Sequence, residues 1–174
     1  MKNNENRRDF ISRAGTTMTI LAWIIFLLIL FGVFDYVSSQ RNNPNQNVLT
    51  TVHGTQKEIV LQRNAYGHYL SSGTINNHEV VFLLDTGASD IAIPESLADD
   101  IGLSKGQTML IKTANGNTTA YRTRLESVAL GDIKRYDLNA TILTNITGKE
   151  VLLGMSFLKH FEIVQKGRSL TIRQ

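Results

Sequence analysis

FLLDTGAS, residues 82–89, is the stretch that decides the fold prediction, because an apolar run ends there in Asp85-Thr86-Gly87, a triplet that occurs once in 174 residues. A carboxylate at the end of a buried strand, followed by a hydroxyl and a glycine, suits a group that activates water for attack on an amide. Such acid hydrolysis needs two carboxyl groups that share a proton, because two like charges about 3 Å apart cannot both ionise. The second carboxyl group must therefore come from another copy of the chain.

Composition predicts one globular domain with an appendage, since 42% of the residues are apolar and 19% are charged. The chain has no cysteine, which excludes a disulfide framework, a thiolate nucleophile and a zinc site that uses cysteine. The net charge of +3 is small, and four of the eighteen basic residues (Lys2, Arg7, Arg8 and Arg13) precede residue 16. We therefore do not expect a nucleic-acid partner.

The segment from Thr16 to Phe34 carries no ionisable side chain and is long enough to span a bilayer. A cleaved signal peptide is the alternative, with a weak small-residue site at residues 37–39, and a buried helix of a soluble protein is the least favoured interpretation. The apolar core is longer than a usual signal core, so we expect a transmembrane anchor over residues 16–36. Basic residues before the span predict that residues 1–15 are a cytoplasmic tail. The rest would then be periplasmic or otherwise extracytoplasmic, on the inner membrane if the cell is Gram-negative.

Residues 37–56 are expected to form a polar linker, because SSQRNNPNQN (residues 38–47) has nothing to bury. From residue 57 to 174, short runs of β-branched and aromatic residues alternate with Asn and Gly, which predicts an all-β domain. The expected strands cover residues 57–62, 67–75, 78–85, 107–114, 117–130, 133–144, 161–166 and 169–173. Tight turns are expected at Asn76-Asn77 and Gly131-Asp132.

Two short helical segments are predicted, one from Glu95 to Ile101 after Pro94 and one from Met155 to His160. The second segment follows another apolar strand, VLLG (residues 151–154), which ends in glycine. Between the two apolar strands, Ala114-Asn115-Gly116 separates two strand-like runs and predicts a mobile hairpin able to cover a substrate.

These elements together resemble the retropepsin-like aspartic proteases, and most closely their single-domain, membrane-anchored bacterial branch. The resemblance covers residues 57–174 and rests on FLLDTGAS, TANG (residues 113–116) and LLGMSFL (residues 152–158), in the family's order. It implies an acid-protease barrel with one or two short helices, preceded here by the transmembrane helix. It also implies an endopeptidase that acts as a homodimer on protein or peptide substrates without a metal or organic cofactor.

The resemblance assigns roles to individual residues. Asp85 would be catalytic, Thr86 would link the two protomers' loops through its hydroxyl, and Gly87 would hold the carboxylate in place, with Ala88 and Ser89 supporting the loop. Ala114, Asn115 and Gly116 would form the flap. Leu153 and Gly154 would brace the loop by packing.

One departure from the family's pattern and one rival function remain open. Retroviral members usually have an acidic residue where this chain has Ser89, so Asp90, one position later, is not assigned a fixed substrate contact. The fold could also serve as a dimerisation or peptide-binding module with little or no proteolysis, because a fold does not prove chemistry. Other hydrolase classes are disfavoured, since the sequence contains neither H-E-x-x-H nor G-x-S-x-G.

Overall fold

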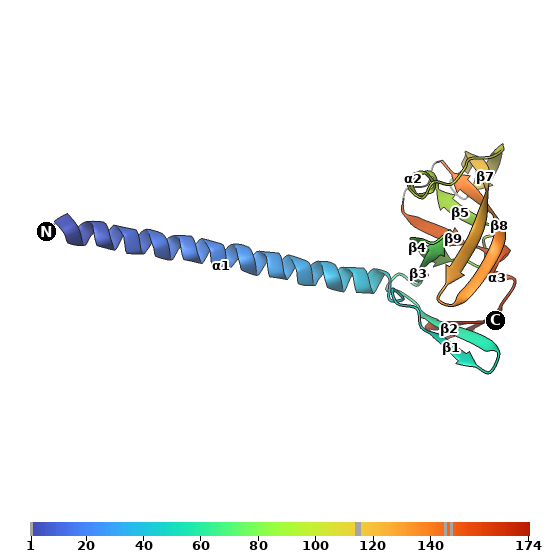
Figure 1. Ribbon diagram of the computed structural model, residues 1–174, viewed down its shortest axis with the longest axis horizontal. Coiled ribbons are helices and arrows are strands. Elements are labelled where there is room, and N and C mark those ends of the chain that lie inside the picture. The colour runs from blue at the N-terminus through green and yellow to red at the C-terminus, as the bar shows by residue number, and fades with distance from the viewer. Residues whose placement is uncertain (1, 114–115, 145, 147) are drawn as a thin grey trace. The chain divides into compact units, whose positions relative to one another are not determined.

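The computed structural model describes residues 2–113, 116–144, 146 and 148–174, and the chain divides into two compact units, Met1–Gln40 and Arg41–Gln174. The first unit belongs to a single helix, α1 (Lys2–Asn42), drawn in blue in Figure 1. Its part from Thr17 to Asn42 is long and apolar enough to cross a membrane, judged by length and composition alone. An N-terminal signal sequence would have the same properties.

The second unit is built around a seven-stranded sheet with the order β3-β4-β9-β5-β8-β7-β6 (Figure 1). The strands are β3 (Tyr69–Ile75), β4 (His78–Leu84), β5 (Ile91–Pro94), β6 (Thr108–Thr113), β7 (Gly116–Leu130), β8 (Ile133–Leu143) and β9 (Glu150–Leu153). β3 also pairs with β7 through Thr74 and Ile75, which closes the sheet into a barrel. The predicted all-β barrel is therefore confirmed.

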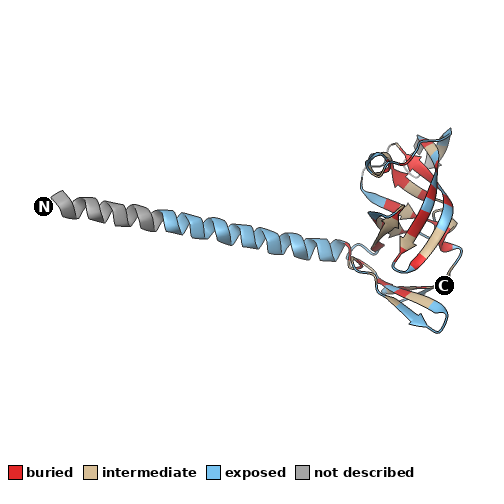
Figure 2. Cartoon of the chain, viewed as in Figure 1, coloured by how far each residue is buried: buried red, intermediate tan, exposed pale blue. Residues whose placement is uncertain are grey.

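A second, four-stranded sheet has the order β1-β2-β11-β10. Its strands are β1 (Thr50–His53), β2 (Gln56–Gln62), β10 (Glu162–Lys166) and β11 (Ser169–Arg173). Alternate side chains of β2 and β11 point into the core, so Ile59, Leu61, Leu170 and Ile172 are buried. The other residues of this sheet are exposed or partly buried (Figure 2).

The core lies inside the barrel and under its two short helices. β4 supplies Val80, Phe82 and Leu84 as buried alternate residues, so the strand leading to Asp85 is anchored along one whole face. α3 (Met155–Leu158) buries Phe157 and Leu158 beside it in the same cluster. The end of β4 is consequently fixed by packing on the residues that precede Asp85.

Asn and Gly residues in the sequence correctly predicted the turns in which the backbone has positive φ. Asn76 and Asn77 have φ values of 50° and 68°, as expected of a two-residue hairpin turn. Gly131 has φ 54° at the predicted turn between β7 and β8. The helix expected from Glu95 is α2 (Glu95–Asp100), whose side chains Glu95 and Asp99 both bind Lys105.

The polar segment after α1 differs from the predicted linker over residues 37–56. α1 continues to Asn42, and β1 occupies residues 50–53 of that range. Asn43 and Asn45 are buried, with exposed fractions of 8% and 6%. The expectation that residues 38–47 bury nothing is wrong. The buried side chain of Asn45 forms hydrogen bonds with backbone groups of β2 and β3 in place of water. β5 was also not expected as a strand.

Candidate active site

Asp85 stands at the point where the chain leaves β4. Its backbone N–H donates to the carbonyl oxygen of Leu153 at 3.2 Å, which extends the parallel pairing of β4 with β9 by one residue. Leu153 is fully buried in the core. The backbone of Asp85 is therefore held by a strand that lies more than sixty residues later in the sequence.

The residues after Asp85 form a tight loop that we call the Asp85 loop, residues 85–90. The N–H of Gly87 donates to Asp85 Oδ1 at 2.8 Å, and the N–H of Ala88 donates to the Asp85 carbonyl at 3.2 Å. A Cβ at position 87 would lie 3.1 Å from the same Oδ1, so glycine lets the backbone approach the carboxylate closely. The first bond orients the carboxyl group, and the second tightens the backbone turn that follows Asp85.

A second contact holds the middle of the Asp85 loop against the start of α3. Met155 and Ser156 donate backbone N–H bonds to the carbonyls of Ala88 and Ser89, at 2.8 and 3.0 Å. Gly154 comes directly before Met155. A Cβ on Gly154 would lie within 2.6 Å of the Ala88 carbonyl oxygen and closer still to the carbonyl oxygen of Asp90. Position 154 thus has no room for a side chain, because backbone atoms of the Asp85 loop occupy that space.

Asp90 closes the loop with both carboxylate oxygens engaged inside the chain. Oδ1 accepts the N–H of Ile91 at 2.9 Å, and Oδ2 accepts the hydroxyl of Thr141 on β8 at 2.8 Å. Thr141 is 9% exposed. Sequence reasoning missed Thr141, since a threonine in a strand carries no signal of its partner, and Asp90 has a role within the fold.

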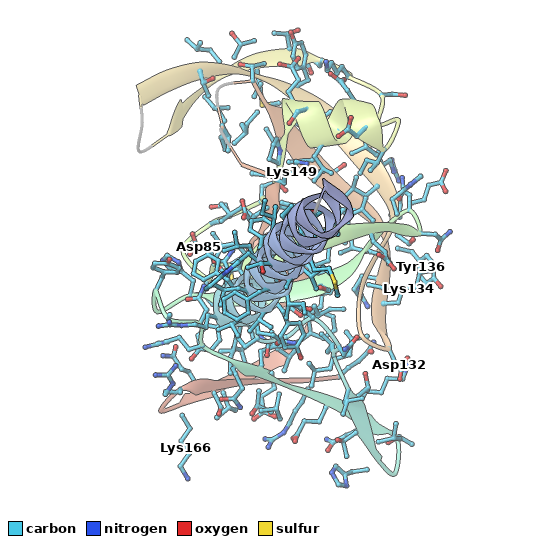
Figure 3. The ribbon with its side chains drawn as sticks, turned by 90° about the vertical axis from the view of Figure 1, so that its left-hand side faces the viewer. Asp85, Asp132, Lys134, Tyr136, Lys149 and Lys166 are labelled. Atoms are coloured by element: carbon cyan, nitrogen blue, oxygen red, sulfur yellow. The ribbon has the colours of Figure 1, made fainter. Side chains whose placement is uncertain are left out.

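The Asp85 triplet is open to solvent in the single chain. Asp85, Thr86, Gly87 and Ser89 are all exposed, although buried strands carry them. Figure 3 shows Asp85 on the opposite side of the domain from Lys134 and Tyr136, which pair with each other through a cation–π contact. A carboxylate in such an open position has room for an apposed surface.

The predicted flap corresponds to the hairpin of β6 and β7, in which Thr113 pairs with Gly116. Gly116 is the first residue of β7, whereas Ala114 and Asn115 lie outside the described residues.

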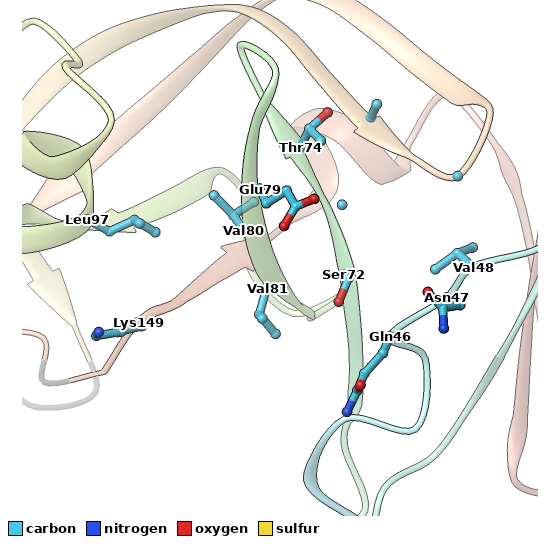
Figure 4. Close-up of a pocket in the computed structure, with 13 residues that line it drawn as sticks. Gln46, Asn47, Val48, Ser72, Thr74, Glu79, Val80, Val81, Leu97 and Lys149 are labelled. Carbon is cyan, nitrogen blue, oxygen red and sulfur yellow. The ribbon is translucent and has the colours of Figure 1, made fainter. Parts of the chain in front are cut away.

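A wide groove of about 810 Å³ lies elsewhere on the domain, beside β3 and β4 (Figure 4). Residues 46–48 form one wall, and Leu97 and Lys149 lie on the other side. The groove does not include Asp85. Among the described residues, no three His, Asp or Glu side chains lie together as a metal site would require.

Comparisons with known proteins agree with this geometry. Residues 71–160 match the profile of the family described as "gag-polyprotein putative aspartyl protease". A retropepsin-like aspartic protease from Rickettsia conorii, solved by crystallography, superimposes with a TM-score of 0.59 at 26% identity, over 72% of this chain and 97% of that one.

Two curated bacterial proteins are also similar in sequence. One, encoded in the cobV 5′ region of a Sinorhizobium species, is 34% identical over 70% of this chain. The other, from Rickettsia prowazekii, is 33% identical over 66% of it, and both are uncharacterised. The chain spans about half the length of these two relatives, 54% and 50%. The family match covers more than half of the chain and includes the whole Asp85 loop, so this chain belongs to that family of aspartyl proteases and has the retropepsin-like fold.

Proposed function

We propose that the protein is a membrane-anchored aspartic endopeptidase whose catalytic centre forms when two copies bring their Asp85 carboxyl groups together. The observation that carries the proposal is the single, exposed Asp85, held by Gly87 and Leu153 at the end of a buried strand. One carboxyl group per chain cannot serve as both acid and base at once, so the second must come from a symmetry-related chain.

In the proposed reaction, the ionised Asp85 of one protomer accepts a proton from a water molecule as its oxygen attacks the carbonyl carbon of the peptide. The protonated Asp85 of the other protomer donates a hydrogen bond, and then its proton, to the carbonyl oxygen. The resulting diol collapses as the C–N bond breaks: the leaving nitrogen takes the proton from the Asp85 that accepted it from water, and one diol hydroxyl returns a proton to the other Asp85. Thr86 would connect the two loops across the twofold axis, and the β6–β7 hairpin would close over the substrate.

The proposed location follows from α1. A span near residues 16–36 with four basic residues before it would keep the N-terminus in the cytoplasm and place Arg41–Gln174 outside, in the periplasm of a Gram-negative cell. Confinement to a membrane raises the local concentration of the protomers, so a weak pairing in solution would suffice in place.

The deciding experiment compares the wild-type chain with Asp85→Asn, which removes the ionisable group and keeps the size. Both are incubated with an unfolded model protein at mildly acidic pH. We expect cleavage by the wild type only. Equal cleavage by both would refute Asp85 as the catalytic group, and no cleavage by either dimeric preparation would favour a peptide-binding module.

Mixing the two chains tests the shared centre directly. If one active dimer needs two intact Asp85 residues, random pairing with a tenfold excess of Asp85→Asn chains should lower the activity of the wild-type chains about tenfold. Activity that stays proportional to the amount of wild-type chain would contradict a dyad built from two copies.

A further inference from the structure

The segment that joins α1 to the domain is bound to the domain by its own side chains. We call residues 41–45 the junction. The side chain of Asn45 bonds to backbone groups of two strands, as a neighbouring strand would. Its oxygen accepts the N–H of Gln62 at 2.7 Å, and its amide nitrogen donates to the carbonyls of Gln62 and Leu70 at 2.9 and 2.6 Å. Its backbone carbonyl accepts the N–H of Ser72 at 3.1 Å. The junction thus bridges the end of β2 and the middle of β3.

The residues before Asn45 are held as well. Asn43 donates to the Ser72 hydroxyl at 3.2 Å and accepts the N–H of Asn45 at 3.0 Å. Asn64, itself 4% exposed, donates to the carbonyl of Asn42 at 3.0 Å. A segment with this many buried polar bonds is part of the folded domain, because releasing it would leave those groups unpaired.

We infer that the docked junction shortens the tether between the anchor and the protease domain, which restricts cleavage to polypeptide segments that lie close to the membrane surface. The substrate class is then proteins that are themselves attached to the membrane, cut in their membrane-proximal part. This inference rests on the proposed function and names its substrate class.

Chain connectivity sets the limit, whatever the orientation of the domain. From Tyr36, at the end of the expected span, to the docked Asn42 the chain can extend by about 20 Å at ~3.5 Å per residue. A free linker over residues 37–56 would have reached about 70 Å. A domain of about 130 residues has a radius of gyration of ~14 Å and a diameter of ~36 Å. Asp85 can therefore lie at most about 55 Å from the membrane surface.

A distance measurement tests the tether without using activity. The chain has no cysteine, so Lys166→Cys supplies one labelling site, at the exposed last residue of β10 and away from Asp85 in Figure 3. The labelled full-length chain is placed in liposomes whose lipid headgroups carry the acceptor dye. A matched chain carries about 40 Gly and Ser residues inserted between Gln40 and Arg41, which adds a random-coil reach of ~35 Å.

We expect energy transfer in the inserted chain to fall to about half that of the chain with the natural tether. Equal transfer would overturn the inference, and so would release of the domain from the liposomes by loss of α1. Asn45→Ala should also lower the transfer by undocking the junction, whereas Asn47→Ala, an exposed asparagine two residues later, should not. If Asn45→Ala fails to fold, the insertion still decides the question.

Hydrolysis then tests the substrate class. The test uses a segment of an unfolded model protein that the full-length chain cleaves in detergent. This segment is attached to a transmembrane helix, either directly or behind a helical spacer of about 70 residues, which adds ~100 Å. In liposomes, the wild type should cut the distant segment at least about tenfold more slowly than the near one, and the Gly/Ser insertion should reduce that difference.

Equal rates on both segments would overturn the short tether. Failure to cut even the free segment in detergent would instead refute the proposed function, and the energy-transfer measurement would still test the tether by itself.

Discussion

Gly154→Ala is the substitution for which the structure makes the sharpest prediction. Gly154 has φ −94° and ψ −167°, an extended backbone that alanine adopts freely. On backbone grounds alone the change should stabilise the fold by about 0.4–1 kcal/mol, because alanine restricts the unfolded chain. The added Cβ, however, would lie within 2.6 Å of the Ala88 carbonyl oxygen and closer still to that of Asp90.

Both contacts are with backbone atoms, so no flexible side chain can move aside. Overpacking of this kind costs about 1–3 kcal/mol. Moving the Asp85 loop also weakens the bonds from Met155 and Ser156 to Ala88 and Ser89, worth about 1 kcal/mol each. We expect a net destabilisation of about 3 kcal/mol, or a fall of about 10 °C in Tm for a domain of this size.

The assay is thermal and urea unfolding of Arg41–Gln174 followed by circular dichroism, since the one tryptophan, Trp23, lies outside this unit. Gly54→Ala is the matched control: its φ is 65° and a Cβ there meets nothing within 4 Å, so only backbone strain of about 1 kcal/mol applies. A Gly154→Ala protein as stable as the wild type would refute the close approach of the Asp85 loop to α3.

Three further predictions concern other contacts of the domain. Thr141→Val removes the hydroxyl that binds Asp90 and should cost about 1.5 kcal/mol in urea unfolding, whereas Thr141→Ser keeps the bond and should cost less than half as much; equal losses would point to packing instead. The bond from Arg124 lowers the pKa of Asp137, so this carboxylate stabilises the fold above its unfolded pKa of about 3.9 and loses that effect as the pH falls through the folded pKa. Because the pair is exposed, Asp137→Asn should leave the urea midpoint at pH 7 nearly unchanged. A large drop in that midpoint would contradict this prediction. Asp137 has φ 60°, so Asp137→Val should lower the melting temperature clearly while Asp137→Gly does not, and equal melting temperatures would show that the strand relaxes.

The parts of the fold that follow from local chemistry were predictable from the sequence. Consecutive Asn76 and Asn77 define a turn that needs positive φ at both positions, and the apolar run VVFLL (residues 80–84) predicts the strand that leads to Asp85. In both cases the residues that carry the signal also make the structure. The grouping of Asp85, Gly87 and Gly154 around one loop was implied by the resemblance to the retropepsin-like proteases.

The unpredicted parts depend on partners that are far away in sequence. Asn45 reads as a linker residue because its partners, Gln62 and Leu70, become neighbours only when β2 and β3 have formed. β5 has four residues and ends in Pro94, too short for a periodic pattern, and it becomes a strand through its parallel pairing with β8. Thr141 likewise acquires its bond to Asp90 from that pairing.

The dependence of the Asp85 loop on residues 153–156 affects the order in which the protein matures. A nascent polypeptide that has emerged only as far as β8 already contains Asp85, Gly87 and Asp90, but the backbone groups of Leu153, Met155 and Ser156 are still missing. Contacts between segments so far apart form late, because the intervening chain must first be ordered. Synthesis therefore delays the shaping of the carboxylate loop until nearly the whole domain has been made.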